Sequence, residues 1–295
     1  STSGAGGVLV DVNNNNRIDD SAVLLTRGGD FRFLNNGTSR SFSEVIGGLN
    51  LSEGNFRIIT ASAGSGGSST LTFGSIQRQL GATIDFYGVD FSTGSLSRVV
   101  GSIGQNALNR VLFTQNPVLD NDIIGGWATI DDEWATYSAT NGVTRLASDK
   151  YDTGDQTGWI SSDNVKLNND RTLSAGTLRT INSLNAQGRL INFNGGRLSI
   201  ESGGILNHTG TARIGQAGIA GSLTMGLPMG VSSTLNVINN GNVEINVPIR
   251  DFVTTINAPA TAKDVTVITL PNVVGLLSGM EVSGSGLLDG TRILS

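Results

Sequence analysis

The chain lacks cysteine altogether and has one histidine and five prolines among its 295 residues. Without cysteine no disulfide can form, and with a single histidine the usual ligands of zinc and other transition metals are missing. The scarcity of proline excludes a collagen-like or proline-rich chain. These absences fit a bacterial secreted repeat protein, because stacking between repeats then takes the place of disulfides.

Charged residues are also scarce, at 15% of the sequence against roughly 25% in an average soluble domain. The surface must therefore consist mainly of serine, threonine, asparagine and glycine, which is typical of proteins outside the cell. The net charge of −5 predicts that neither nucleic acid nor an anionic membrane is a partner. No run reaches the ~18 apolar residues of a membrane helix, so we predict no membrane insertion by this segment.

The sequence is rich in one short pattern, in which two small residues precede an apolar–polar–apolar stretch. The pattern occurs at residues 28–33, 47–51 and 195–200, with looser copies at 69–73 and 221–225. Alternation with period two predicts a strand with one buried face, and its recurrence predicts many short strands. Such strands stack coil upon coil, so the sequence predicts a parallel β-solenoid with coils of roughly 20–25 residues.

The rhythm of this pattern divides the chain into four segments. They are coils at 1–93 and 161–250, an irregular β insertion at 94–160 that carries all three tryptophans, and a small β module at 251–295. Within the coils we expect apolar side chains at equivalent positions to form a continuous interior. The leading members are Leu49, Leu51, Leu71, Phe73, Leu198, Ile200, Leu223 and Leu235.

Several motifs in a fixed order identify a similar family. They lie at residues 16–23, 28–29, 43–49, 69–73, 123–129, 134–137 and 141–143. Over roughly residues 8–250 the chain resembles the autotransporter-associated β-strand repeat proteins. The resemblance implies a right-handed β-helix within a very large bacterial secreted or surface protein, with adhesion or envelope structure as its function. Residues 251–295 depart from the repeat. Because the chain shows no leader sequence and ends within an apparent strand, we expect a segment of a longer, processed protein.

The predicted fold class is therefore all-β, a right-handed parallel β-helix with an irregular insertion and a small C-terminal β module. We predict a non-enzymatic structural or adhesive protein of the bacterial cell surface, a rod, stalk or fibre segment that assembles into filaments. Its expected partners are other copies of itself, envelope components or surface glycans. The alternative is a secreted polysaccharide lyase or glycoside hydrolase on the same β-helix scaffold.

One candidate metal site lies near the N-terminus. Asp11, Asn13 and Asn15 stand at the first three ligand spacings of a calcium loop. However, Asn16 occupies the position of the loop glycine, and Ala22 the position of the bidentate acid. We therefore favour a polar turn and predict no cofactor, with calcium as the alternative.

The candidate catalytic residues of the enzyme alternative are Asp131, Asp132 and Glu133, next to Trp134 and Tyr137. Paired carboxylates beside aromatic rings are typical of glycoside cleavage, with one acting as an acid and the other as a base or nucleophile. The same residues could form a sugar platform or a calcium site. On a strand, however, adjacent residues point to alternate faces. We therefore favour a structural interpretation with no catalytic residues, in which the aromatic rings bury a joint and the acids stay in water.

Overall fold

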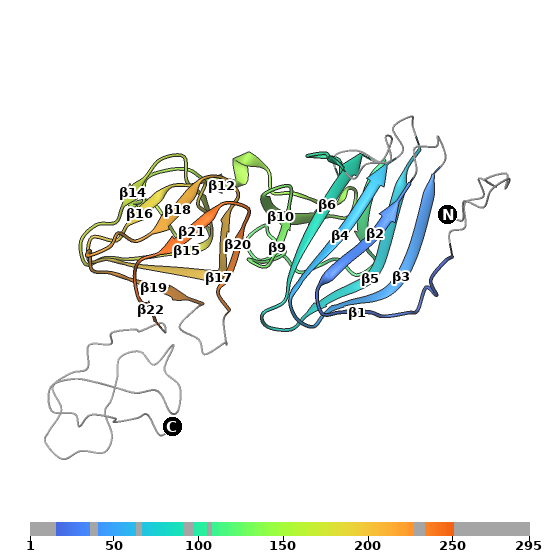
Figure 1. The fold of residues 1–295 in the computed structure, drawn as a ribbon, viewed down its shortest axis with the longest axis horizontal. Helices are drawn as coiled ribbons and strands as arrows, with labels where there is room; N and C mark the ends of the chain where they lie inside the picture. Colours follow the sequence, from blue (N-terminus) through green and yellow to red (C-terminus); the bar gives the residue numbers. More distant parts are fainter. Residues whose placement is uncertain are drawn as a thin grey trace, which may run out of the picture. The chain divides into compact units, whose positions relative to one another are not determined.

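The computed structural model describes residues 16–35, 41–62, 67–90, 97–104, 108–226 and 234–250. Among these residues the regular elements are strands, apart from one short 3₁₀ turn, η1 (Ser148–Lys150) (Figure 1). No helix in this part of the chain is long and apolar enough to cross a membrane. The chain divides into two compact units, Ser1–Tyr151 (unit 1) and Asp152–Ser295 (unit 2). The all-β class is thus confirmed.

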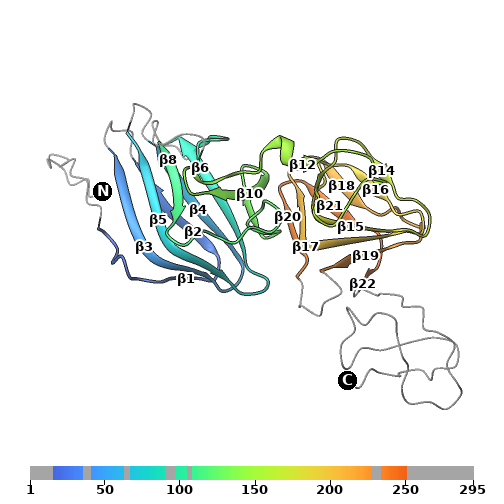
Figure 2. The same ribbon diagram turned by 180° about the vertical axis from the view of Figure 1, so that it is seen from behind.

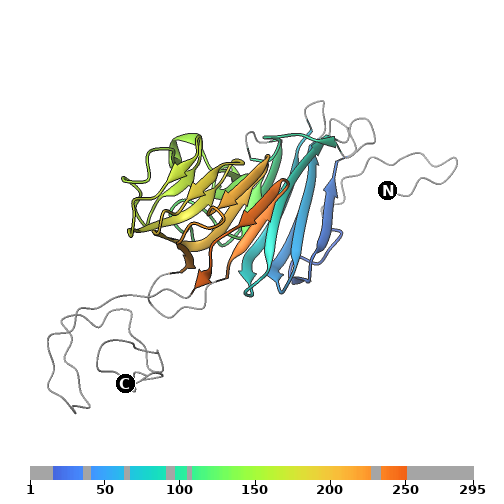
Figure 3. The same cartoon turned by 60° about the vertical axis from the view of Figure 1, so that its left-hand side comes forward.

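Unit 1 contains two sheets built mainly from parallel pairs. The first has the order β1 (Leu24–Thr26), β3 (Phe42–Leu51), β5 (Ser69–Arg78) and β8 (Asn109–Phe113). The second begins with β2 (Gly29–Leu34), β4 (Asn55–Ser62), β6 (Thr83–Asp90) and β9 (Ala128–Ile130). Figure 3 shows the strands of unit 1 as near-parallel arrows whose colours step from blue to green, and Figure 2 shows the same order from behind.

Three antiparallel strands complete the second sheet. They are β10 (Glu133–Ser138), which pairs with β9; β11 (Gly142–Arg145), which pairs with β10; and the short β7 (Ser97–Arg98), which pairs with β6. Part of the segment predicted as an insertion therefore continues the sheets, since β8 and β9 pair in parallel with β5 and β6. The four predicted segments themselves stay a prediction, and residues 251–295 lie outside the described residues.

The register of the parallel pairs is regular, and it aligns apolar residues at buried positions. Gly29 pairs with Phe56 in the second sheet, and Phe42 pairs with Ser69 in the first, a step of 27 residues each time. The apolar residues Ile46, Phe73 and Phe113 follow one another across three strands of the first sheet. The Phe73 and Phe113 rings are stacked, with centroids 5.9 Å apart. Each of these strands therefore adds apolar side chains to one core.

Some strands are longer than the sequence predicts, because small residues lie inside a strand instead of separating two strands. Gly47 lies inside the ten-residue β3, and Gly74 lies inside the ten-residue β5. A Cβ on Gly74 would stand 2.6 Å from the carbonyl oxygen of Gly47, so only glycine lets the two coil backbones approach so closely there. By contrast, Gly28 and Gly29 have φ of 97° and 93° and form the predicted turn between β1 and β2.

Unit 2 also has two mainly parallel sheets. The first has the order β12 (Tyr151–Asp152), β13 (Asn164–Lys166), β15 (Leu178–Asn185), β17 (Arg197–Asn207), β19 (Ser222–Met225) and β22 (Ile249–Arg250), with β20 (Asn236–Asn239) also on β17. The second has the order β14 (Arg171–Thr172), β16 (Leu190–Asn192), β18 (Thr211–Ile214) and β21 (Asn242–Ile245). Asn207, at the end of β17, links segments that lie before and after it in the chain. Its Oδ1 accepts the N–H of Gly188, and its Nδ2 donates to the carbonyl oxygen of Asn242.

The predicted interior is confirmed for seven of its eight named members. The buried members are Leu49, Leu51, Leu71, Phe73, Leu198, Ile200 and Leu223. Leu235 is partly buried against the same cluster of unit 2. The alternation in the sequence thus identified the inward positions, because period-two patterning is a local property of a strand.

Candidate functional site

A row of polar side chains crosses one face of the second sheet of unit 1. Asp30 (β2), Arg57 (β4), Asp85 (β6) and Thr129 (β9) are register partners in successive strands. Neighbouring residues in these strands, such as Ile58, belong to the buried core. Because side chains alternate along a strand, the row lies on the face away from that core. We call these four residues the polar row.

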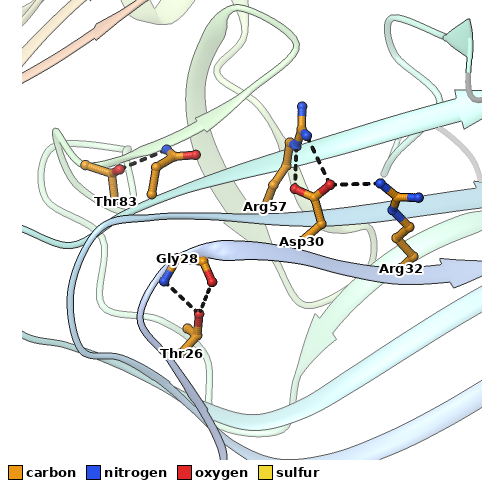
Figure 4. Close-up of polar contacts among 7 residues, drawn as sticks. Thr26, Gly28, Asp30, Arg32, Arg57 and Thr83 are labelled. Atoms are coloured by element: carbon orange, nitrogen blue, oxygen red, sulfur yellow. Dashed lines mark hydrogen bonds and ion pairs between the residues drawn. The ribbon is translucent and has the colours of Figure 1, made fainter.

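Asp30 binds two arginines at one end of the polar row. Arg57 Nε and Nη2 donate to Asp30 Oδ1 and Oδ2 at 3.0 and 3.1 Å, and Arg32 Nη2 donates to Oδ2 at 3.1 Å (Figure 4). The hydrogen bonds from Arg57 lower the pKa of Asp30. The glycine turn before β2 positions this carboxylate, and Thr26 Oγ1 accepts the N–H of Gly28 there at 3.1 Å.

Asp85 differs from Asp30 because it is partly buried, whereas Asp30 is exposed. Burial raises its pKa to about 6, against the hydrogen bond from Thr129 and the charges of Arg98 and Arg57. The negative charge of Asp132 raises it further. Thr129 Oγ1 donates to Asp85 Oδ1 at 3.0 Å. Asp85 is therefore a carboxyl group that takes up and releases a proton near neutral pH.

Two of the predicted catalytic acids, Asp131 and Asp132, lie beside the Thr129 end of the polar row. Asp131 and Asp132 form the two-residue turn between β9 and β10, where Ile130 pairs with Glu133. Their φ angles of 52° and 65° are the positive values that a type I′ hairpin turn requires, and aspartate tolerates them. Both residues thus lie in a turn and not on a strand.

Arg98 of β7 joins both turn carboxylates. Its Nη1 donates to Asp132 Oδ2 at 2.7 Å, and its Nε stands 3.7 Å from Asp131 Oδ1. Asp131 Oδ2 also accepts the N–H of Gly101 at 2.5 Å. The Asp131 side chain is 1% exposed, and burial raises its pKa. The expectation that these acids stay in water is therefore wrong for Asp131.

Tyr87 lies between the two groups of charges. The guanidinium carbons of Arg57 and Arg98 each stand 5.4 Å from the centroid of its ring. A guanidinium over an aromatic face is attracted by the negative charge of that face. The ring therefore connects the Asp30 end of the polar row with the Asp131–Asp132 turn.

Glu133, the third predicted acid, has a different partner. Its Oε2 accepts the hydroxyl hydrogen of Tyr151 at 2.8 Å, and the same hydroxyl oxygen accepts the N–H of Trp134 at 3.2 Å. Trp134 is fully buried, as the interpretation of an aromatic joint requires. The structure therefore brings Asp131 and Asp132 together at Arg98 and joins Glu133 to Tyr151.

The predicted calcium residues Asp11, Asn13 and Asn15 lie outside the described residues. Within the described ranges, no group of three histidine or acidic side chains could hold a metal ion. Asp122, which precedes the predicted catalytic acids in the chain, forms an ion pair with Lys150, with 3.1 Å between Oδ2 and Nζ.

Comparison with family models, with curated proteins and with solved structures gives no match. The site must therefore be interpreted from its own chemistry. Its carboxylates at Asp30, Asp131 and Asp132 are engaged by arginines, so this face carries ion pairs between strands and turns of unit 1.

Asp85 is the functional candidate that the sequence interpretation missed. A repeat spacing could have revealed it, since Asp30, Arg57 and Asp85 stand 27 and 28 residues apart. Residues at one coil spacing and of opposite charge are expected to be neighbours in a parallel sheet.

Replacing Asp85 by asparagine tests this site through its pH dependence. Because folding raises the pKa of Asp85, the wild-type protein loses stability relative to Asp85→Asn as the pH rises from about 4 to about 6. We expect equal stability at pH 4 and a variant more stable by roughly 1–3 kcal/mol at pH 8. Urea unfolding of both proteins at pH 4 and pH 8 measures this difference in stability.

Asp30→Asn on the same face is the matched control, and its effect has the opposite sign. The pKa of Asp30 is lowered by folding, so its stabilising contribution is present at pH 8 and is lost as the pH falls. We therefore expect Asp30→Asn to be less stable than the wild type at pH 8. An Asp85→Asn protein that is destabilised at pH 8 would contradict the assignment.

Proposed function

We propose that this chain is a segment of a non-enzymatic structural or adhesive protein of the bacterial cell surface, built as a right-handed parallel β-helix. The observation that carries the proposal is the in-register parallel pairing at the spacing of one coil, as between Phe42 and Ser69. Right-handed crossover is the strong preference for parallel strands joined in this way. Such an array suits a rod, stalk or fibre segment, because length is gained by adding coils.

The neutral polar composition and the net charge of −5 support an extracellular location. They also support partners other than nucleic acid or an anionic membrane. The expected partners are other copies of the chain, envelope components or surface glycans. The proposal includes end-to-end assembly into filaments, since an end coil whose strand edges are uncovered can pair with another coil.

The arrangement of the predicted catalytic acids supports a structural role. Asp131 and Asp132 share Arg98, while Glu133 binds Tyr151. A glycoside-cleaving pair needs two carboxyl groups facing one substrate bond. Carboxylates engaged by a common arginine instead stabilise the turn that carries them.

Immunogold electron microscopy of the cells that make the protein tests this function. With an antibody against this segment, we expect label along surface fibres or an envelope layer. Label confined to free protein in the medium would overturn the proposal and favour the secreted polysaccharide lyase or glycoside hydrolase. Asp132→Asn would then be the first variant to assay on a panel of polysaccharides.

A further inference from the structure

We propose that residues 17–22 form a cap over the first coil of unit 1, and that this cap prevents β3 from pairing with a strand of a second copy. The inference rests on the proposed function in one respect, that copies of the chain meet end to end. What it adds is the contact that controls this association, namely the contact between the cap and β3.

Among the described residues, the cap occupies a part of the β3 edge that no strand pairs with. β3 pairs with β5 from Phe42 to Leu51, but its other edge pairs with β1 only from Leu49 to Leu51. Along the rest of this edge, Gly47 N donates to the carbonyl oxygen of Ala22 at 2.9 Å. The cap therefore uses a backbone donor of β3 that a further strand would otherwise engage.

Glu44 of β3 holds the start of the cap. Its Oε1 accepts the N–H groups of Arg17 and Ile18, both at 2.8 Å, and its Oε2 stands 3.5 Å from Arg17 Nη1. The Glu44 side chain is 2% exposed. A buried carboxylate is costly unless such charge-assisted hydrogen bonds satisfy it, so Glu44 and the cap require each other.

The position of Glu44 distinguishes β3 from the strands that follow it in the sheet. Its register partner in β5 is Leu71, and the next partner in β8 is Val111, both fully buried. Glu44 therefore places an acid where the following coils carry apolar residues. An inward-pointing charge at a sheet edge is a device that stops a further strand from adding.

Two further contacts fix the cap. The Arg17 guanidinium carbon stands 5.8 and 5.6 Å from the ring centroids of Phe33 and Phe42. At the other end, a Cβ on Gly47 would lie 2.7 Å from the carbonyl oxygen of Ser21 and 2.8 Å from that of Ala22. Only glycine at this position lets the cap backbone approach β3 so closely.

Beside the cap, the end coil exposes apolar side chains. Val23 is 58% exposed and Leu25 is 64% exposed. With the cap displaced, these side chains and the freed edge of β3 form a surface suited to a strand of a second copy, held by main-chain hydrogen bonds. Release of the cap is thus expected to convert a blocked end into an associating one.

Glu44→Leu in the full chain tests the proposal with two readouts. The first is tryptic cleavage after Arg17, which is the first lysine or arginine of the sequence, followed by intact mass measurement. The second is the molar mass in solution by light scattering over a range of concentrations. We expect cleavage faster by about tenfold or more, as the loss of these hydrogen bonds implies, together with concentration-dependent dimers or larger species.

Glu53→Leu is the matched control. It removes the same charge from an exposed pair with Arg27, where the Glu53 side chain is 65% exposed, and should change neither readout. Gly47→Ala is a second route to the same state, because its Cβ displaces the cap and leaves Glu44 in place. It covers the case in which Glu44→Leu fails to fold.

The proposal is overturned if Glu44→Leu and Gly47→Ala stay monomeric with wild-type cleavage after Arg17. It is equally overturned if cleavage accelerates while both proteins stay monomeric, since the segment would then be no barrier to association. Either result leaves the immunogold test of the proposed function unaffected, because that test locates the wild-type protein and does not depend on the cap.

Discussion

Ile200→Asp is expected to unfold unit 2. Ile200 is fully buried in β17, and its register partners are Ile181 of β15 and Met225 of β19. The variant loses roughly 1.5–3 kcal/mol of apolar burial and places an unpaired carboxylate between apolar layers, so we expect a loss of more than about 4 kcal/mol. Hydrogen exchange followed by mass spectrometry reports the loss of protection in each unit separately.

Ile249→Asp is the control for this result. It makes the same chemical change in the same sheet, but Ile249 is 49% exposed, and we expect an effect within about 0.5 kcal/mol. Hydrogen exchange in β15, β17 and β19 that stays at the wild-type rate in Ile200→Asp would contradict the assignment of Ile200 to the buried interior of unit 2.

The second large effect is expected at Arg98. Arg98→Met keeps an apolar side chain of similar length but removes the ion pair between Arg98 and Asp131, whose side chain is 1% exposed. Breaking a buried ion pair by removing one partner typically costs about 3–5 kcal/mol, so we expect a loss of that size in unit 1. Urea unfolding at pH 8, followed by far-ultraviolet circular dichroism, measures it.

The same loss is expected to be smaller at low pH. Burial raises the pKa of Asp131, so its ionised form is the one that the fold disfavours. A group with a raised pKa stabilises the fold at low pH and loses that contribution as the pH rises. Protonation at pH 4 should therefore relieve much of the effect of Arg98→Met.

Two further variants show whether the buried charge is the cause. Arg27→Met removes an arginine that is 74% exposed in its pair with Glu53, and should cost less than about 1 kcal/mol. Adding Asp131→Asn to Arg98→Met removes the unpaired charge while keeping an acceptor for the N–H of Gly101, and should restore part of the stability. An Arg98→Met protein as stable as Arg27→Met would refute the proposed role of this pair.

Much of the fold followed from local patterns in the sequence. The alternation at 31–33 places Phe33 in the core and Arg32 outside, and the structure confirms both positions. The pairs of small residues were harder to interpret. Gly28 and Gly29 precede the apolar alternation of a strand as predicted, but Gly47 lies inside a strand, where the backbone of Ser21 and Ala22 passes close beside it. Such a close approach depends on the tertiary structure and leaves no signature in the local sequence.

The site was less predictable, because its contacts join residues far apart in the chain. Arg98 and Asp132 are 34 residues apart, and Arg17 and Glu44 are 27 apart. The adjacency of Asp131, Asp132 and Glu133 was visible, but their partners were not. The two-residue turn places the carboxylates of Asp131 and Asp132 beside Arg98. The carboxylate of Glu133, at the start of β10, binds Tyr151 instead.

The sequence by itself determined the all-β class, the inward and outward positions of the strands, and a composition poor in charged residues and without cysteine. These follow from period-two patterning and residue counts, which are properties of short segments. Only the tertiary structure decided which segments pair, that Asp85 is a partly buried carboxyl with a raised pKa in the polar row, and that Glu44 binds the backbone of Arg17 and Ile18. Register and burial depend on how the strands pair, because each strand supplies hydrogen-bond partners to the next strand and excludes solvent from it.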